Sequence, residues 1–233
     1  MRKILLSVLI VLLALLTGCS QDRIDRKQYD AMYSHLSQVW AQSLAHTDAK
    51  VAFFGDSRVI GADWNAAYPD SKVVNLGIGG DRIGNLLTRM SQIRTLSENG
   101  QLECVFLAIG GNDCMSGSYD SAVFRTGYDR LLTELEDLGM TVYVNTVAGI
   151  TDEDSNVSSK TAKTVNGRMK EANTIIKELA QSHSMTVIDM AALMNNSDGK
   201  LKSSYALPDG VHFSAAGNQL WFDTLRPYVQ IYD

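Results

Sequence analysis

The stretch Val51-Ala-Phe-Phe54-Gly55-Asp56-Ser57 decides the fold of this chain. Its apolar run, rich in β-formers, predicts a strand, and the Gly-Asp pair predicts a sharp turn directly after it. Four similar runs follow, separated by helical patterns, at residues 72–76, 104–109, 140–147 and 185–188. Strands that alternate with helices predict an α/β fold with a central parallel five-stranded sheet and crossover helices.

The rest of the chain fits one domain over residues 49–233, without internal repeats. The amphipathic patterns predict helices over about 82–96, 119–138, 161–182 and 214–225. Ser214 is the expected N-cap of the last helix. The polar stretch 151–160 predicts a solvated loop close to the carboxyl edge of the sheet, at the rim of a site.

Polar clusters follow three of the predicted strands at the point where each strand ends. They are Gly55-Asp56-Ser57, Gly77-Ile-Gly-Gly80-Asp81 and Gly110-Gly-Asn112-Asp113. Ligands of open parallel sheets bind at the carboxyl edge of the strands, so we expect these clusters to meet there. A fourth cluster, Asp209-Gly-Val-His212, precedes the last helix.

Ser57 and His212 are the candidate nucleophile and base. A loop serine taken alone is weak evidence, because most such hydroxyls only contact solvent. Asp209 lies three residues before His212, a spacing at which its carboxylate can hold one imidazole nitrogen and leave the other free for Ser57. We expect Asp56 to bond local backbone. The remaining histidines, which have no carboxylate at this spacing in a loop near the sheet edge, are His35, His46 and His183.

Gly80 and Asn112 are the candidate donors for an oxyanion. A glycine allows close approach to a backbone N–H, and an asparagine amide can aim a second donor at the same oxygen. The Ser57 N–H would be the third. The run Gly77-x-Gly79-Gly80 also resembles a phosphate-binding loop, but it lacks the Gly-x-Gly-x-x-Gly spacing and the lysine of such loops. We therefore expect acyl transfer through a serine ester.

The composition argues against several other partners. The histidines are few and scattered, and no metal-binding motif occurs, so we expect neither a metal nor a cofactor. Cys104 and Cys114 flank a predicted strand and should lie too far apart for a disulfide, which predicts two free thiols. The net charge of −5 becomes −7 once residues 1–18, which carry two basic residues and no acidic one, are removed. An acidic domain of this kind argues against nucleic acid as a partner.

The N-terminus reads as a targeting segment. Arg2 and Lys3 precede the apolar run 4–16, which is short for a membrane span. Leu16-Thr-Gly18-Cys19 then resembles the lipobox of bacterial lipoproteins. This resemblance implies a lipoprotein signal peptide over residues 1–18 and a lipid on Cys19 that anchors the protein to a membrane. The alternative is an ordinary secretory signal with an incidental cysteine.

Residues 19–25 read as a polar tether between the lipidated cysteine and the rest of the chain. Over 26–48 we expect an amphipathic helix, whose apolar residues recur at three- and four-residue spacing up to position 44. Packing on the domain is the simplest interpretation. A partner surface or a second membrane contact is the alternative.

The four clusters together resemble the blocks of the SGNH (GDSL-type) hydrolases, a family of serine esterases. The resemblance spans about residues 50–225 and implies a flavodoxin-like, three-layer α/β/α fold. It matches the family's serine, glycine, asparagine and histidine to Ser57, Gly80, Asn112 and His212, and its triad aspartate to Asp209. Arg58 stands where the Gly-Asp-Ser-Leu form has leucine, at a position that varies within the family.

This resemblance implies serine-dependent hydrolysis of carboxylic esters through an acyl-enzyme. The expected substrates are short acyl groups on carbohydrates or other small esters, acted on at the bacterial cell envelope, outside the cytoplasm. One alternative is a lysophospholipase or thioesterase that takes longer acyl chains. The other is a lipoprotein that keeps the fold as a binding or scaffold module. The oligomeric state is left open.

Overall fold

The computed structural model describes residues 47–233. The expected signal peptide over 1–18, the lipidated Cys19, the tether over 19–25 and most of the helix expected over 26–48 lie outside these residues. Residues 47 and 48, the last two assigned to that helix, are not helical. Over the described part of the chain, no helix has the length and apolar character needed to cross a membrane.

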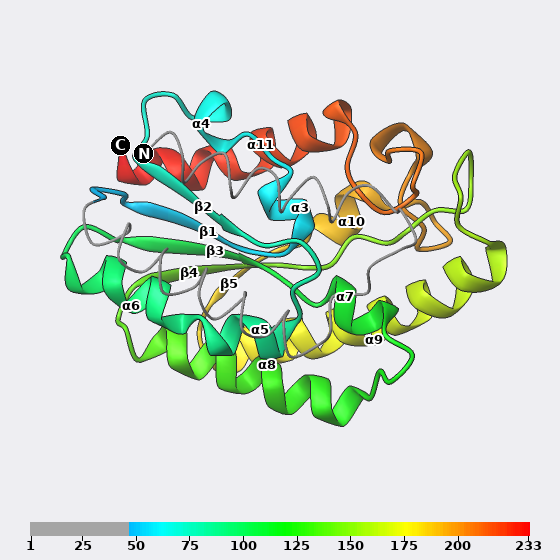
Figure 1. Cartoon of the computed structure of the whole chain (residues 1–233), viewed down its shortest axis with the longest axis horizontal. Helices are drawn as coiled ribbons and strands as arrows, with labels where there is room; N and C mark the ends of the chain where they lie inside the picture. The colour runs from blue at the N-terminus through cyan, green and yellow to red at the C-terminus, as the bar shows by residue number, and fades with distance from the viewer. Residues whose placement is uncertain (1–46) are drawn as a thin grey trace, which may run out of the picture. The chain divides into compact units, whose positions relative to one another are not determined.

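Five parallel strands form one sheet, as the sequence predicts, and their order is β2-β1-β3-β4-β5 (Figure 1). Each strand lies within one residue of the predicted run or inside it. The bounds are β1 Val51–Gly55, β2 Val73–Gly77, β3 Cys104–Ala108, β4 Thr141–Asn145 and β5 Thr186–Ile188. In the register of β1, Gly55 pairs with Gly77 on one side and with Ala108 on the other. The strands therefore end at one edge, where the polar clusters begin.

Both faces of the sheet are buried, which explains the unbroken apolar runs. Ala52 and Phe54 point into a core on one face, and Val51 and Phe53 point into a second core on the other. Such alternation follows from the two-residue period of a strand. Helices cover each face, so the domain is the predicted three-layer α/β/α sandwich.

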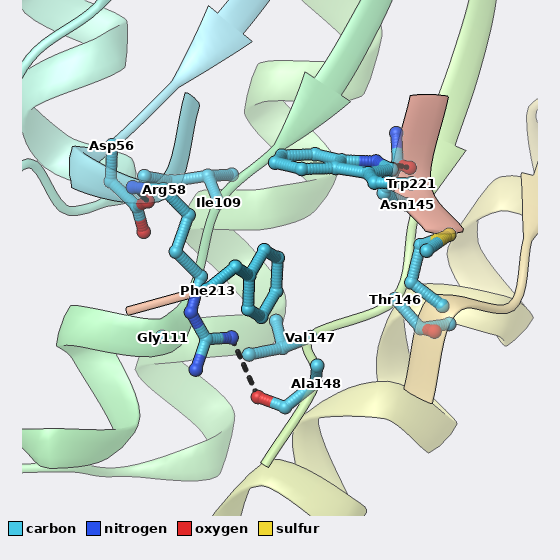
Figure 2. Close-up of a pocket in the computed structure, with 12 residues that line it drawn as sticks. Asp56, Arg58, Ile109, Gly111, Asn145, Thr146, Val147, Ala148, Phe213 and Trp221 are labelled. Atoms are coloured by element: carbon cyan, nitrogen blue, oxygen red, sulfur yellow. Dashed lines mark hydrogen bonds between the residues drawn. The ribbon is translucent and has the colours of Figure 1, made fainter. Parts of the chain in front are cut away.

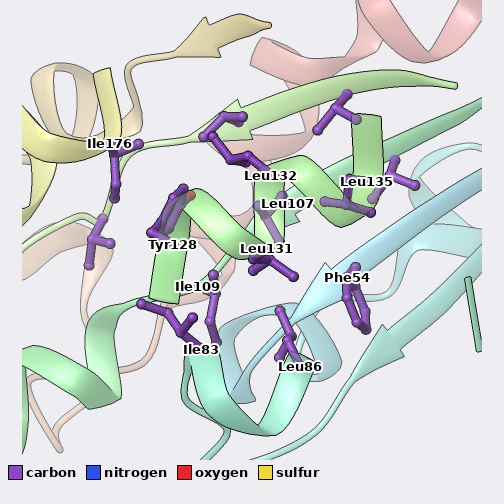
Figure 3. Packing of buried hydrophobic residues seen from close by; sticks show 14 of the residues in the cluster. Phe54, Ile83, Leu86, Leu107, Ile109, Tyr128, Leu131, Leu132, Leu135 and Ile176 are labelled. Carbon is purple, nitrogen blue, oxygen red and sulfur yellow. The ribbon is translucent and has the colours of Figure 1, made fainter. Parts of the chain in front are cut away.

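The larger core lies under four helices: two short consecutive ones and two long ones (Figure 3). They are α5 Ile83–Thr88, α6 Met90–Glu98, α8 Ser121–Glu136 and α9 Ser159–Ser182. The prediction of a single helix over 82–96 is wrong in one respect: the segment forms two helices, α5 and α6, which are separated at Arg89. The Arg89 guanidinium is fully buried and bonded to the carbonyl groups of Gly55 and Leu76 at the strand ends, which fixes the chain at this point.

The opposite face carries α4 Trp64–Ala67, α10 Met190–Met194 and α11 Ala215–Val229. Its core is aromatic: the rings of Phe53 and Trp64 stack with centroids 3.7 Å apart, and Trp221 of α11 packs edge-on at 4.9 Å from Trp64. The Ser214 hydroxyl accepts from the Gly217 N–H, so the predicted N-cap is confirmed, although α11 continues beyond residue 225.

The remaining elements are short and were missed by the sequence analysis, because one helical turn contains no recognisable period. They are α3 Ser57–Ile60, α7 Gly111–Met115 and the two 3₁₀ turns Ser203–Tyr205 and Gln230–Tyr232. The predicted loop over 151–160 is confirmed as far as residue 158, where the Ser158 hydroxyl caps α9 by accepting from the Thr161 N–H. Cys104 and Cys114 are free and buried in different cores, which confirms two unbridged thiols.

Candidate active site

Ser57 lies at the turn between β1 and α3. A side chain at Gly55 would place its Cβ only 2.1 Å from the Ala108 carbonyl oxygen, so glycine is required where β1 passes β3. Asp56 caps α3: its Oδ1 accepts from the Arg58 N–H at 3.0 Å, the local backbone bond expected from the sequence. Ser57 is then the first residue of α3, where its backbone N–H has no partner within the helix.

The loop before α11 brings His212 to Ser57. The His212 Nε2 lies 2.9 Å from the Ser57 Oγ, although the two residues are 155 positions apart. On the other side of the ring, Nδ1 lies 2.7 Å from the Asp209 Oδ2. The three side chains form the hydrogen-bonded series that a serine nucleophile, a base and an orienting carboxylate require.

Asp209 is held as an acceptor for the imidazole. Its Oδ1 accepts from the backbone N–H groups of Val211 and His212, at 2.8 and 2.9 Å. Partial burial raises the pKa of the Asp209 carboxyl, but the hydrogen bonds from the His212 ring and from these two N–H groups outweigh it and hold the pKa below its usual value. The carboxylate therefore stays ionised beside the ring.

The loop that carries this pair, residues 207–212, is closed by its own backbone. The Leu207 N–H donates to the His212 carbonyl, and the Gly210 N–H donates to the Leu207 carbonyl, both at 2.8 Å. The loop 151–158 supports it from outside: the Thr151 N–H donates to the Gly210 carbonyl at 2.9 Å. The stretch expected at the rim of the site thus packs against the loop that presents His212.

The glycine run that carries Gly80 lies beside Ser57, and α7 carries Asn112. A Cβ built on Gly79 would lie 4.0 Å from the Ser57 Cβ, so the glycine run passes directly beside the serine. Gly80 adopts a left-handed φ of 80° that favours glycine. The Asn112 Nδ2, on α7, donates to the Asp81 carbonyl at 2.8 Å. This bond fixes the amide at the Asp81 carbonyl, one residue after Gly80, and leaves its second hydrogen available.

Two carboxyl groups adjoin candidate donor residues in the chain: the buried Asp56 precedes Ser57, and the partly buried Asp113 follows Asn112. Burial raises the pKa of the Asp56 carboxyl above its usual value, and the Arg58 charge acts against this. On α7, burial raises the pKa of the Asp113 carboxyl to about 6, although the Ile83 N–H donates to it at 3.3 Å. The bond from Ile83 ties the start of α5 to the helix that carries Asn112.

Arg89 is a supporting residue that the sequence analysis did not identify. Its fully buried guanidinium pairs with the Asp81 carboxylate at 2.8 Å and donates to the Gly55 carbonyl at 2.8 Å. It thereby joins the end of β1, just before Ser57, to the residue that orients the Asn112 amide. The sequence does contain a sign that Arg89 is buried. Arg89 lies three residues after Leu86, so it falls on the apolar face of the predicted helix.

The other described histidine serves a different purpose. His183 is the C-cap residue of α9 and lies between two carboxylates of α8, with its Nε2 2.9 Å from Asp129 and its Nδ1 2.6 Å from Glu136. Both ring nitrogens are engaged there, so neither is left for a serine. Across residues 47–233, no group of three or more histidine, cysteine, aspartate and glutamate side chains is arranged to hold a metal ion.

The comparison with protein families agrees with this geometry. The model of the GDSL-like lipase/acylhydrolase family matches residues 43–220, which is most of the chain. The protein is an ester hydrolase, and its chain belongs to the GDSL-like lipase/acylhydrolase family. A search of curated proteins finds no match.

Solved structures share the fold at low sequence identity. A Streptococcus pneumoniae protein described as a platelet activating factor is 18% identical, with a TM-score of 0.71 over 90% of this chain and 100% of its own. A GDSL-like lipase from Bacteroides thetaiotaomicron is 17% identical, with a TM-score of 0.69 over 83% and 97%. An acetyl xylan esterase from Geobacillus stearothermophilus is 21% identical, with a TM-score of 0.58 over 77% and 94%.

Proposed function

We propose that the protein hydrolyses carboxylic esters through an acyl-enzyme on Ser57. The Ser57 Oγ attacks the ester carbonyl while His212 Nε2 takes its proton, and the same proton then leaves on the departing alcohol. Water attacks the acyl-enzyme in turn, with His212 again as the base, and releases the acid and the free serine. The observation that carries this proposal is the 2.9 Å contact between Ser57 Oγ and His212 Nε2.

Asp209, Gly80 and Asn112 have complementary roles in this mechanism. Asp209 holds the imidazole tautomer that accepts the serine proton and stabilises the imidazolium that forms. The N–H groups of Ser57 and Gly80 and the Asn112 amide stabilise the tetrahedral oxyanion. Loss of one such donor costs about 10²–10³ in rate in comparable sites. The bond from the Asn112 amide to the Asp81 carbonyl supports this role, because it fixes the direction of the donor before substrate arrives.

We propose short acyl groups on carbohydrates or other small esters as the substrates. Acetyl xylan esterases among the structures with this fold support the choice. With p-nitrophenyl esters and the protein beginning at residue 20, kcat/KM should be highest from acetyl to butyryl. It should fall by about 10-fold or more at octanoyl, because each unaccommodated methylene has a cost in the transition state. An optimum at palmitoyl would contradict this choice and favour the lysophospholipase or thioesterase alternative.

We also propose that the protein works at the bacterial cell envelope, anchored by lipid on Cys19. The apolar run 4–16 and the small residues before Cys19 support this location. In a bacterial host, the full-length chain should incorporate a fatty-acid label and sediment with membranes. A Cys19→Ser variant should lose the label. A label that persists in this variant would contradict lipidation at Cys19.

A further inference from the structure

Arg58 reaches from the candidate nucleophile's helix to the loop that carries His212. Its Nε donates to the Val211 carbonyl at 3.0 Å, and its two terminal nitrogens donate to the carbonyls of Ala148 and Gly149, at 2.7 and 2.8 Å. Figure 2 shows the guanidinium beside the Phe213 ring with its bond to Ala148. One side chain thus links three segments: the start of α3, the segment after β4 and the loop before α11.

The contacts of Arg58 lie on both sides of His212 in the chain. Val211 directly precedes the histidine, and Phe213 directly follows it, with its ring centroid 4.7 Å from the guanidinium carbon. Arg58 itself directly follows Ser57. The side chain is therefore a short connection from the residue beside the nucleophile to both neighbours of the base.

Other hydrogen bonds hold the His212 loop, but they join it to the loop 151–158 and not to α3: the Thr151 and Asn156 N–H groups donate to the Gly210 and Pro208 carbonyls. The loop 207–212 and the His212–Asp209 pair are closed by bonds within the loop itself, and these bonds do not set the position of the loop relative to Ser57. Loss of Arg58 should therefore leave the loop folded and the histidine paired with Asp209. It should broaden the distance between His212 Nε2 and Ser57 Oγ.

The chemistry of the position requires a guanidinium. Three carbonyl oxygens accept from one planar fork, while an ammonium at the end of a lysine cannot reach all three in these directions. Leucine, the residue of the Gly-Asp-Ser-Leu form, could fill the space but could donate to none of them. Burial lowers the pKa of the Arg58 guanidinium, and the carboxylates of Asp56 and Asp209 act against this.

We propose that Arg58 is a positioning residue that holds His212 within hydrogen-bond distance of Ser57. This proposal rests on the serine mechanism proposed above. Its effect should appear in kcat and not in KM, because the side chain acts on the reacting pair through the backbone of the His212 loop. A displacement of about 1 Å at reacting groups can cost about 10²-fold in rate.

The test compares Arg58→Leu and Arg58→Lys with the full-length protein on p-nitrophenyl acetate. Arg58→Leu should lower kcat about 10²-fold with KM nearly unchanged, and Arg58→Lys should lie between it and the wild type. The matched control is Arg226→Leu. Arg226 also donates to a backbone carbonyl, that of Ala67 at 3.3 Å, and lies 5.4 Å over the Tyr68 ring, but it has no contact with the His212 loop. This control should keep the wild-type kcat.

Proton NMR separates positioning from loss of fold. The downfield Nδ1–H resonance of His212, which reports the bond to Asp209, should persist in Arg58→Leu. An Arg58→Leu variant with the wild-type kcat, or one with a raised KM alone, would overturn the proposal. If Arg58→Leu does not fold, the same two readouts apply to Arg58→Lys. Failure of the serine mechanism would look different, because Ser57→Ala would then retain activity whatever residue stands at position 58.

Discussion

Ser57→Ala is expected to lower kcat for p-nitrophenyl acetate by about 10⁶-fold while the fold survives. The hydroxyl is the atom that forms the acyl bond in the proposed mechanism, and no other described nucleophile lies beside His212 Nε2. Alanine removes the oxygen and keeps the backbone N–H of position 57, so α3 and the oxyanion donors are retained. Circular dichroism and the thermal midpoint should match the wild type.

Two comparisons make this result specific. The double variant Ser57→Ala/His212→Ala should be no slower than Ser57→Ala, because groups that act as one unit do not have additive effects. The matched control is Ser118→Ala, since Ser118 is exposed and its hydroxyl contacts only that of Ser116, at 2.9 Å. Its kcat should be unchanged. Wild-type turnover in Ser57→Ala would exclude the serine as nucleophile.

Asp209→Asn is expected to cost about 10⁴-fold in kcat with little change in stability. An asparagine oxygen can still accept from the N–H groups of Val211 and His212, so the loop keeps its shape. The amide nitrogen would then face His212 Nδ1 and donate to it. The ring would carry its proton on Nε2, the nitrogen that must accept from Ser57, and the base would be blocked in the wrong tautomer.

The control for this substitution is the same change beside the other histidine. Asp129→Asn alters a carboxylate that lies 2.9 Å from His183 Nε2 on the surface of α8. It should leave kcat at the wild-type value. Equal losses in Asp129→Asn and Asp209→Asn would contradict a specific role of Asp209, and so would wild-type kcat in Asp209→Asn.

The fold was predictable because its signals are local and repeated. The central strands β1, β3 and β4 are buried on both faces over most of their length and therefore read as apolar runs, and the long helices α8 and α9 carry a clear period. The break between α5 and α6 was not predictable from periodicity, because it depends on Arg89 and on carbonyl groups from β1 and β2 that are distant in sequence. The one-turn helices were missed because a single turn is too short to show the hydrophobic period of a helix.

The candidate site likewise has a part that could be predicted from the sequence and a part that could not. Ser57, Gly80 and Asn112 could be brought together from the sequence, because parallel strands end at a shared edge. His212 and Asp209 could be paired with each other by their spacing, and the chemistry of a serine nucleophile, which needs a base, joined them to Ser57 before the resemblance to a family did. The role of Arg58 could not be predicted, because its three acceptors come from segments whose paths no local pattern reveals.

Covalent labelling tests the central claim most directly. The full-length protein is treated with a fluorophosphonate, digested, and mapped by mass spectrometry. The account predicts one adduct, on Ser57, that forms rapidly in the wild type, much more slowly in His212→Ala and not at all in Ser57→Ala. An adduct on a different residue, or a labelling rate that does not depend on His212, would contradict the account.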